Sequence, residues 1–95
     1  MYSSKAYREV SKMDMSEINK LLDEIADDRT VPRNIRNMVA ETKKHLNNDK
    51  EDIAIRINSA VSILDEVSND PNIPTYTRTQ IWNIVSLLEI MQNNK

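Results

Sequence analysis

Apolar residues recur along most of the chain at the spacing of an α-helix. Ile18, Leu21, Leu22 and Ile25 stand three and four positions apart, which places them on one helix face. Three further segments carry similar stripes with polar residues between them. Their members are Ile35, Met38, Val39, Thr42 and Leu46; Ile53, Ile57, Ala60, Val61, Leu64 and Val67; and Ile81, Ile84, Val85, Leu88 and Met91. The pattern predicts an all-α chain with helices at about 14–28, 33–47, 50–69 and 75–92.

Two prolines mark helix starts. Pro32 and Pro74 each stand directly before a predicted helix, with the cap-type residues Thr30 and Asn72 two positions earlier. Proline is tolerated in a first turn because the N–H it lacks has no intrahelical partner there. We therefore expect each proline to lie in the first turn of its helix.

Asparagine and aspartate join the second and third predicted helices. Asn47 and Asn48 come directly after the second stripe, and the chain contains no glycine. Asparagine is then the residue best suited to the left-handed conformation that ends many helices. We expect Asp49 to cap the third helix and Asp52 to lie in its first turn.

The two halves of the sequence align with each other at an offset of 42 residues. Leu22-Asp23-Glu24-Ile25 then matches Leu64-Asp65-Glu66-Val67, and Asp28, Pro32 and Arg36 match Asp70, Pro74 and Arg78. Periods near 40 residues are typical of helical-hairpin repeats. The sequence thus predicts a single domain over 14–95, built from two tandem helix–turn–helix hairpins, 14–47 and 50–92, that pack as a four-helix bundle. Residues 1–13 form an N-terminal extension that either frays or continues the first helix.

Composition excludes many kinds of site. The 95 residues carry a net charge of −2, no cysteine, no glycine and one histidine, His45. Thiolate metal sites, phosphate-binding glycine loops and nucleophile elbows all need residues that are absent. No apolar run approaches the length of a membrane span. We therefore expect a cytoplasmic, non-enzymatic protein without cofactor or metal and without membrane contact.

The stretch from Leu21 to about Met91 resembles an archaeal group, the uncharacterised protein family 0147. The matching pieces are Asn69-Asp70-Pro71-Asn72-Ile73-Pro74 with Thr77-Arg78-Thr79, Ile81-Trp82-Asn83-Ile84-Val85-Ser86 and, in the first half, Val31-Pro32-Arg33-Asn34-Ile35-Arg36. The resemblance implies a compact helical fold and an archaeal, cytosolic origin. It implies no activity.

Acidic residues recur at matched places in both halves. They could form a loose two-metal carboxylate cluster, but neither a histidine nor a Glu-x-x-His spacing supports one. We expect instead that Asp28 pairs with Arg36 and Asp70 with Arg78, so that each ion pair closes a loop.

A basic stripe lies on the second predicted helix. Arg33, Arg36, Lys43 and Lys44 share the side opposite its apolar residues. Such a stripe could follow a phosphate backbone. The alternative is a solvent-exposed face whose positive charges balance the acidic residues of the first helix.

The fourth predicted helix is poor in charge, and Trp82 falls on the side that should be polar. The matched position in the first half is Ala40. A large aromatic residue on an outer face, one turn after Arg78, has the composition of an interface anchor. We expect Trp82, Ile90 and Arg78 to form a contact surface.

An intramolecular role for Trp82 is the alternative. Tyr7 and Val10 of the N-terminal extension, or the first helix, would then cover the ring. The leading hypothesis is a small interaction module that forms homo-oligomers or binds a protein partner through the fourth helix. The second hypothesis is an RNA- or ribosome-associated protein that uses the basic stripe.

Overall fold

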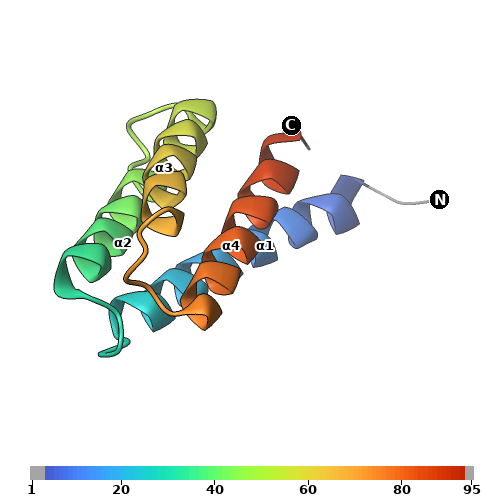
Figure 1. Ribbon diagram of the computed structural model, residues 1–95. Coiled ribbons are helices and arrows are strands. Elements are labelled where there is room, and N and C mark those ends of the chain that lie inside the picture. Colours follow the sequence, from blue (N-terminus) through green and yellow to red (C-terminus); the bar gives the residue numbers. More distant parts are fainter. Residues whose placement is uncertain (1–3, 94–95) are drawn as a thin grey trace.

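The computed structural model describes residues 4–93, with side chains from residue 15 onward. In that part of the chain it contains four helices and no strand (Figure 1). They are α1 (Ser4–Ala26), α2 (Arg33–Leu46), α3 (Ile53–Ser68) and α4 (Thr75–Asn93). The prediction of an all-α chain is confirmed.

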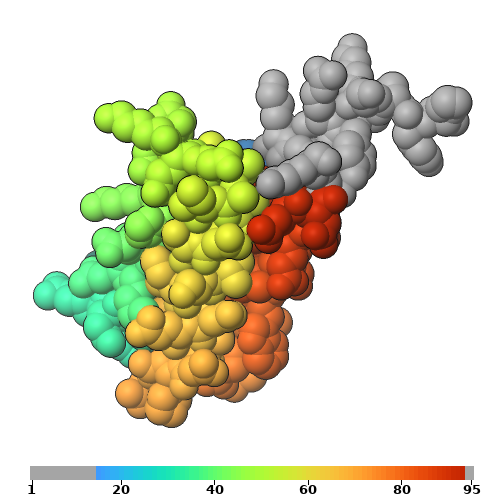
Figure 2. All heavy atoms as spheres, turned by 90° about the horizontal axis from the view of Figure 1, so that it is seen from above, coloured from blue at the N-terminus to red at the C-terminus, as the bar shows by residue number. Residues whose placement is uncertain are grey.

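The four helices contact one another in a ring. Helix α1 packs against α2 and α4, and α3 packs against the same two helices, while neither diagonal pair is in contact within residues 4–93. Figure 2 shows α3 lying between α2 and α4 on one face of the molecule. The loops 27–32 and 69–74 lie at one end of the ring, and the loop 47–52 lies at the other (Figure 1). The α1–α2 and α3–α4 pairs therefore form opposite sides of the molecule.

The core is formed by the apolar stripes of all four helices, closed by one residue from each of two loops. Ile18, Leu22, Ile25, Ile35, Val39, Leu46, Ile57, Ala60, Leu64, Val67, Ile81, Ile84 and Leu88 are buried, together with Val31 and Ile73. Burial of one such leucine or isoleucine side chain contributes about 1.5–3 kcal/mol to the free energy of folding. The stripes read from the sequence are therefore the parts of the helices that hold the ring together.

Two helix boundaries differ from those expected. Helix α1 is longer, since it begins at Ser4 and ends at Ala26, and so continues through most of the expected N-terminal extension. Helix α3 begins at Ile53 rather than near residue 50, because Asp52, not Asp49, takes the N-cap position with φ −60° and ψ 143°. The expectation that Asp49 caps the helix and Asp52 lies in its first turn was therefore wrong, since aspartate stands at both positions and cap propensity is the same for the two.

The prolines lie one position earlier than expected. Pro32 is the N-cap of α2, with φ −55° and ψ 147°, and its carbonyl accepts the first helical bond from the Arg36 N–H at 3.0 Å. Pro74 directly precedes α4, and its carbonyl accepts from the Arg78 N–H at 3.1 Å. The placement in the first turn was therefore wrong by one residue. The physical reason still applies, because the N–H of a cap residue is also outside the helical ladder.

All three loops begin with the same turn. In each, the side-chain oxygen of an aspartate or asparagine accepts a bond from the backbone N–H two residues later, as such residues do in turns. The three bonds run from Thr30 to Asp28 at 2.9 Å, from Lys50 to Asn48 at 3.2 Å and from Asn72 to Asp70 at 2.8 Å. The cap-type residues Thr30 and Asn72 thus belong to turns and do not cap helices.

An arginine eight residues after each turn ties the loop to the helices beside it. Arg36 Nε donates to Val31 O at 3.1 Å. Arg56 donates from Nε to Glu51 O at 2.9 Å and from Nη1 to Leu46 O at 3.3 Å. Arg78 donates from Nε to Ser68 O at 2.9 Å and from Nη2 to Asp70 O at 3.0 Å. The expected ion pairs Asp28–Arg36 and Asp70–Arg78 were therefore wrong. Carbonyls at helix ends lack helical partners, and guanidinium groups satisfy them here.

No residue in the described part of the chain has a positive φ. The expectation of a left-handed asparagine was therefore wrong, since Asn47 has φ −102° and ψ 10° and Asn69 has φ −86° and ψ −5°. Both helices end in tight turns instead, as the Asn47 N–H donates to the carbonyls of Lys43 and His45. Because the chain contains no glycine, its helices cannot end in the left-handed glycine conformation that is common elsewhere. The hydrogen bonds from the arginines take the place of that conformation.

Candidate functional site

Three large apolar side chains are exposed on the outer face of α4. Trp82 is 57% exposed, Ile90 is 48% exposed and Tyr76 is 67% exposed. Their neighbours Ile81 and Leu88 are fully buried, because successive helical positions turn by about 100° and point to different sides. The structure therefore places Trp82 and Ile90 on open surface, and it adds Tyr76, which the sequence analysis did not select.

Arg78 has a different role from the one its position in the sequence suggested. Its guanidinium is half-buried and donates to Ser68 O and Asp70 O, at the end of α3. It lies at the boundary between α3 and α4 rather than on the open face. Trp82, one turn further along, therefore stands on the side of α4 that is nearer to α3.

Few charges surround Trp82 on its own helix. Glu89 is exposed two turns further on and is the sole charge between Thr79 and Met91. Asn83 and Ser86 complete the polar part of this face. The covering of the ring by Tyr7 and Val10, the alternative left open by the sequence, concerns side chains that lie outside the described residues.

The structure does not hold the four basic residues of α2 in one free stripe. Lys43 Nζ lies 2.9 Å from Asp23 Oδ1 and 3.0 Å from Asp23 Oδ2, so that its charge faces α1. Arg36 is bonded to the loop carbonyl of Val31. Arg33 and Lys44 are exposed. Of the four basic residues that the sequence placed in the stripe, Arg33 and Lys44 are therefore the two that face solvent without a partner in the described part of the chain.

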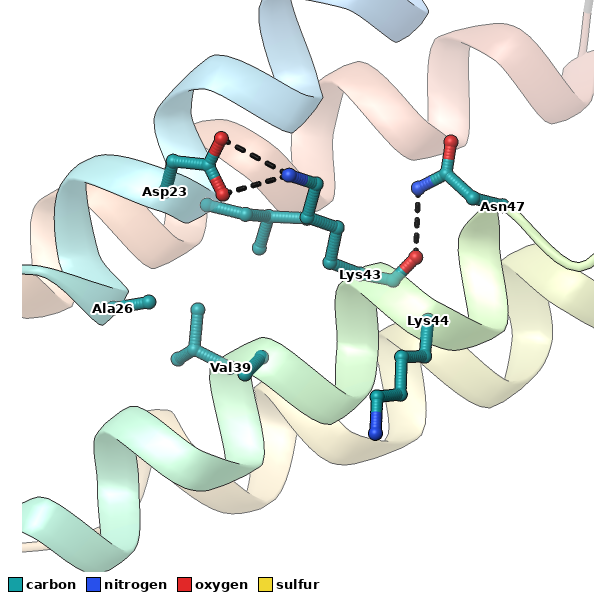
Figure 3. A pocket seen from close by; sticks show the side chains of 8 residues that line it. Asp23, Ala26, Val39, Lys43, Lys44 and Asn47 are labelled. Carbon is teal, nitrogen blue, oxygen red and sulfur yellow. Dashed lines mark hydrogen bonds and ion pairs between the residues drawn. The ribbon is translucent and has the colours of Figure 1, made fainter.

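A groove runs along the outside of the α1–α2 pair. It has a volume of about 430 Å³ and is lined by Leu22, Asp23, Ala26, Val39, Ala40, Lys43, Lys44 and Asn47. Figure 3 shows the Lys43–Asp23 ion pair crossing from α2 to α1 above Ala26 and Val39, with Lys44 on the far side. The floor is apolar, and lysine side chains form its rim.

Small side chains keep this groove open. Ala26 on α1 and Ala40 on α2 face it, and neither reaches far enough to fill the space between the helices. The groove could not be read from the helical pattern, because an alanine on the outer side of a helix is ordinary. The matched pair Ala40 and Trp82 was the available signal.

The turn that contains Asp28 lowers the pKa of the Asp28 carboxyl. Hydrogen bonds from the Thr30 hydroxyl and the Thr30 N–H lower the pKa of its carboxyl below the usual range, with a smaller contribution from the positive charge of Arg36. These bonds stabilise the ionised carboxylate. The shift belongs to a turn that shapes the loop and does not mark a reactive group.

The acidic residues and the histidine are dispersed among the described side chains. No group of three His, Asp or Glu residues among them is arranged to hold a metal ion. Thr77 Oγ1 and Gln80 Oε1 are buried without a hydrogen-bond partner within residues 15–93. Thr77 is fully buried in the core, whereas Gln80 is half-buried and donates from Nε2 to the Tyr76 hydroxyl at 3.4 Å.

No helix in the described part of the chain is long and apolar enough to cross a bilayer.

Comparison with known proteins gives consistent matches. The model of the Uncharacterised protein family (UPF0147) matches residues 2–91. A UPF0147 protein of Methanothermobacter thermautotrophicus is 42% identical over 92 residues, which cover 94% of this chain and 90% of that protein. A UPF0147 protein of Methanocaldococcus jannaschii is 54% identical over 69 residues, which cover 73% of this chain and 74% of that protein.

A solved structure agrees with the arrangement of the helices. The crystal structure of a protein from uncharacterized family UPF0147 from Thermoplasma acidophilum superposes with a TM-score of 0.84 at 37% identity. The superposition covers 87% of this chain and 98% of that chain.

Proposed function

The chain belongs to the Uncharacterised protein family (UPF0147), and from that premise we propose that it is a small non-enzymatic interaction module whose contact surface is the outer face of α4. The observation that carries the proposal is the exposure of Trp82, Ile90 and Tyr76 on one helix. Soluble proteins seldom leave such a group of large apolar side chains open without a use. Tryptophan and tyrosine are also enriched among the residues that dominate binding energy at interfaces.

The charge distribution supports a protein partner over a nucleic acid. Glu89 is exposed and is the one charged residue between Thr79 and Met91, and the chain as a whole carries a net charge of −2. A phosphate backbone would be repelled by both. An apolar face with a single acidic neighbour matches the composition of a protein interface.

We further propose that the chain consists of two helical hairpins derived from one repeated unit. Matched positions support it, since Leu22 and Leu64 are both buried and so are Val39 and Ile81. The turns at Asp28 and Asp70 also make the same bond. A repeat unit of this kind normally covers its apolar faces with further copies, so two copies alone leave surface for a partner.

The test is capture of the tagged full-length protein from native lysate, with and without nuclease. The variant Trp82→Ala removes the side chain at the centre of the face. The matched control is Ile55→Ala, which removes a 50% exposed apolar side chain from α3 instead. We expect proteins that are retained by wild type and Ile55→Ala to be lost with Trp82→Ala. Identical protein sets for all three would refute the proposal.

The alternative, binding of RNA through α2, rests on the exposed cations Arg33 and Lys44. Lys43 and Arg36 are held by partners within the chain, so the alternative requires them to exchange those bonds for phosphate. In the capture experiment, nuclease sensitivity of the retained material would favour this alternative.

A further inference from the structure

The groove and Trp82 occupy matched places in the two halves of the chain. Ala40, which lines the groove on α2, stands 42 positions before Trp82 on α4. The helices that carry them begin in the same way, with a proline and then an arginine that bonds the loop before it. One half therefore lacks a large side chain at the place where the other half presents one.

The size and lining of the groove suit an aromatic side chain. Its volume of about 430 Å³ exceeds that of a single indole, and its floor is formed by Leu22, Val39 and the two alanines Ala26 and Ala40. Lys44 supplies the exposed lysine of the rim, since the Lys43 ammonium is paired with Asp23, and an ammonium group is attracted to the face of an aromatic ring. An indole that enters would gain apolar burial and a favourable contact with Lys44.

The charges of the two surfaces are complementary. Lys44 is exposed at the rim of the groove, whereas Glu89 is exposed on α4 two turns after Trp82. An α4-to-α4 contact would leave the groove open. Complementary charge across an interface suppresses the wrong arrangement and favours the right one.

We infer that the partner of the α4 face is a second copy of this chain, and that Trp82 of one copy inserts into the α1–α2 groove of the next. This inference rests on the proposed function and names the partner of the same surface. The α1–α2 groove and the α3 side of α4 lie on opposite sides of the ring, so the contact is head-to-tail. Head-to-tail contacts build rings or open chains rather than simple two-fold dimers.

The experiment uses sedimentation of the purified full-length protein at several concentrations. Wild type should show a mass that rises above that of the 11.0 kDa monomer as concentration increases. Trp82→Ala removes the inserted side chain, and Ala40→Trp fills the groove. Each variant alone should remain monomeric, with an affinity roughly 30- to 1,000-fold weaker than that of wild type.

A mixture of the two variants is the decisive measurement. Trp82→Ala keeps an open groove, and Ala40→Trp keeps Trp82, so together they retain one complete contact. We expect the mixture to form a one-to-one complex that grows no further. Ala40→Glu also blocks the groove but adds no aromatic ring. A mixture of Trp82→Ala with Ala40→Glu should therefore form the same one-to-one complex. Circular dichroism shows whether each variant retains its helices.

The other outcomes separate the two proposals. If Trp82→Ala is monomeric while Ala40→Trp and Ala40→Glu assemble like wild type, the groove is not the partner site, although the α4 face remains one. If the mixed variants stay monomeric, the head-to-tail contact is refuted. If wild type is monomeric at every concentration, the second copy is refuted as the partner, and the capture experiment alone decides the α4 face.

Discussion

The guanidinium of Arg78 lies 2.9 Å from the carbonyl oxygen of Ser68, so the first turn of α4 is bonded to the last residue of α3. A second bond, to Asp70 O at 3.0 Å, holds the loop between them. The planar guanidinium makes both bonds at once because its donors point in fixed directions. Arg78 thus sets the direction in which α4 leaves the loop, and with it the position of Trp82.

Loss of the Arg78 guanidinium should destabilise the fold. Hydrogen bonds to a charged group contribute about 1.5–3 kcal/mol each, so Arg78→Met, which removes two, should lower the free energy of unfolding by about 3–6 kcal/mol. Arg78→Lys should recover little of the lost stability, since an ammonium group lacks the fixed, planar set of donors with which the guanidinium reaches both carbonyls. Urea unfolding followed by circular dichroism measures both. The control is Arg33→Met on exposed α2 surface, and an equal loss there would contradict the assignment.

Asp28 should make stability depend on pH in the acid range. Because the folded pKa of its carboxyl is lowered, the ionised group stabilises the folded state at pH values above the unfolded pKa of about 3.9. That contribution is lost as the pH falls through the folded pKa. Asp28→Asn keeps the turn acceptor but removes the charge. Its thermal midpoint should lie below that of wild type at neutral pH, and the gap should close in acid.

Thr30→Val tests the cause of the Asp28 shift, because it removes the hydroxyl that donates to the carboxylate at 2.7 Å. The difference in thermal midpoint between neutral and acid pH should shrink in this variant. An unchanged pH profile would show that Thr30 is not the source of the lowered pKa.

Trp82 should contribute little to folding. Its ring is 57% exposed, whereas the adjacent Ile81 is fully buried. We expect Trp82→Ala to change the free energy of unfolding by less than about 1 kcal/mol in dilute solution, while Ile81→Ala costs about 2–5 kcal/mol. Denaturant titrations at low protein concentration compare the two. A large loss for Trp82→Ala would mean that the ring is part of the core and not a contact residue.

The buried hydroxyl of Thr77 should be dispensable. It lies in the core without a hydrogen-bond partner within residues 15–93, so its desolvation is uncompensated. Thr77→Val keeps the shape and removes the polar atom, and it should stabilise the fold by about 1 kcal/mol. Thr42→Val is the matched control, because the Thr42 hydroxyl is equally buried but donates to Met38 O at 2.9 Å. That variant should gain nothing, and equal gains in both would contradict the argument.

If the basic face of α2 binds RNA, the exposed cations must carry the affinity. Arg33→Glu with Lys44→Glu should then abolish binding, and the affinity of wild type should fall steeply as salt is raised. Fluorescence anisotropy with a labelled RNA measures both effects. No detectable binding by wild type at low salt would remove this alternative.

The sequence was sufficient for the helices because their apolar stripes are the core. Leu22, Ile35, Leu64 and Ile81 were all assigned to inner faces from spacing alone, and all are buried. The prolines marked the starts of α2 and α4 within one residue. Local patterns therefore determined what each helix buries.

The roles of the charged residues depended on tertiary contacts that no local pattern contains. Lys43 was grouped with the free cations, but helix packing brings Asp23 within 2.9 Å of it. Arg36 and Arg78 were paired with nearby carboxylates, although unsatisfied carbonyls lay closer. The third turn, at Asn48 with Arg56, escaped notice because it falls between the matched halves and has Asp52 where the other two loops have proline.

The lack of any positive φ among residues 4–93 bears on how freely this chain can vary over evolutionary time. Proteins whose turns depend on glycine lose stability when that glycine mutates, since other residues resist left-handed geometry. Here every described backbone position is compatible with an ordinary L-residue. Substitutions elsewhere in the loops should therefore be accepted widely, with sensitivity concentrated at the turn acceptor, at the arginine that follows it and at the buried loop residues Val31 and Ile73. Mutational tolerance in these loops is set by side-chain hydrogen bonds and burial and not by backbone shape.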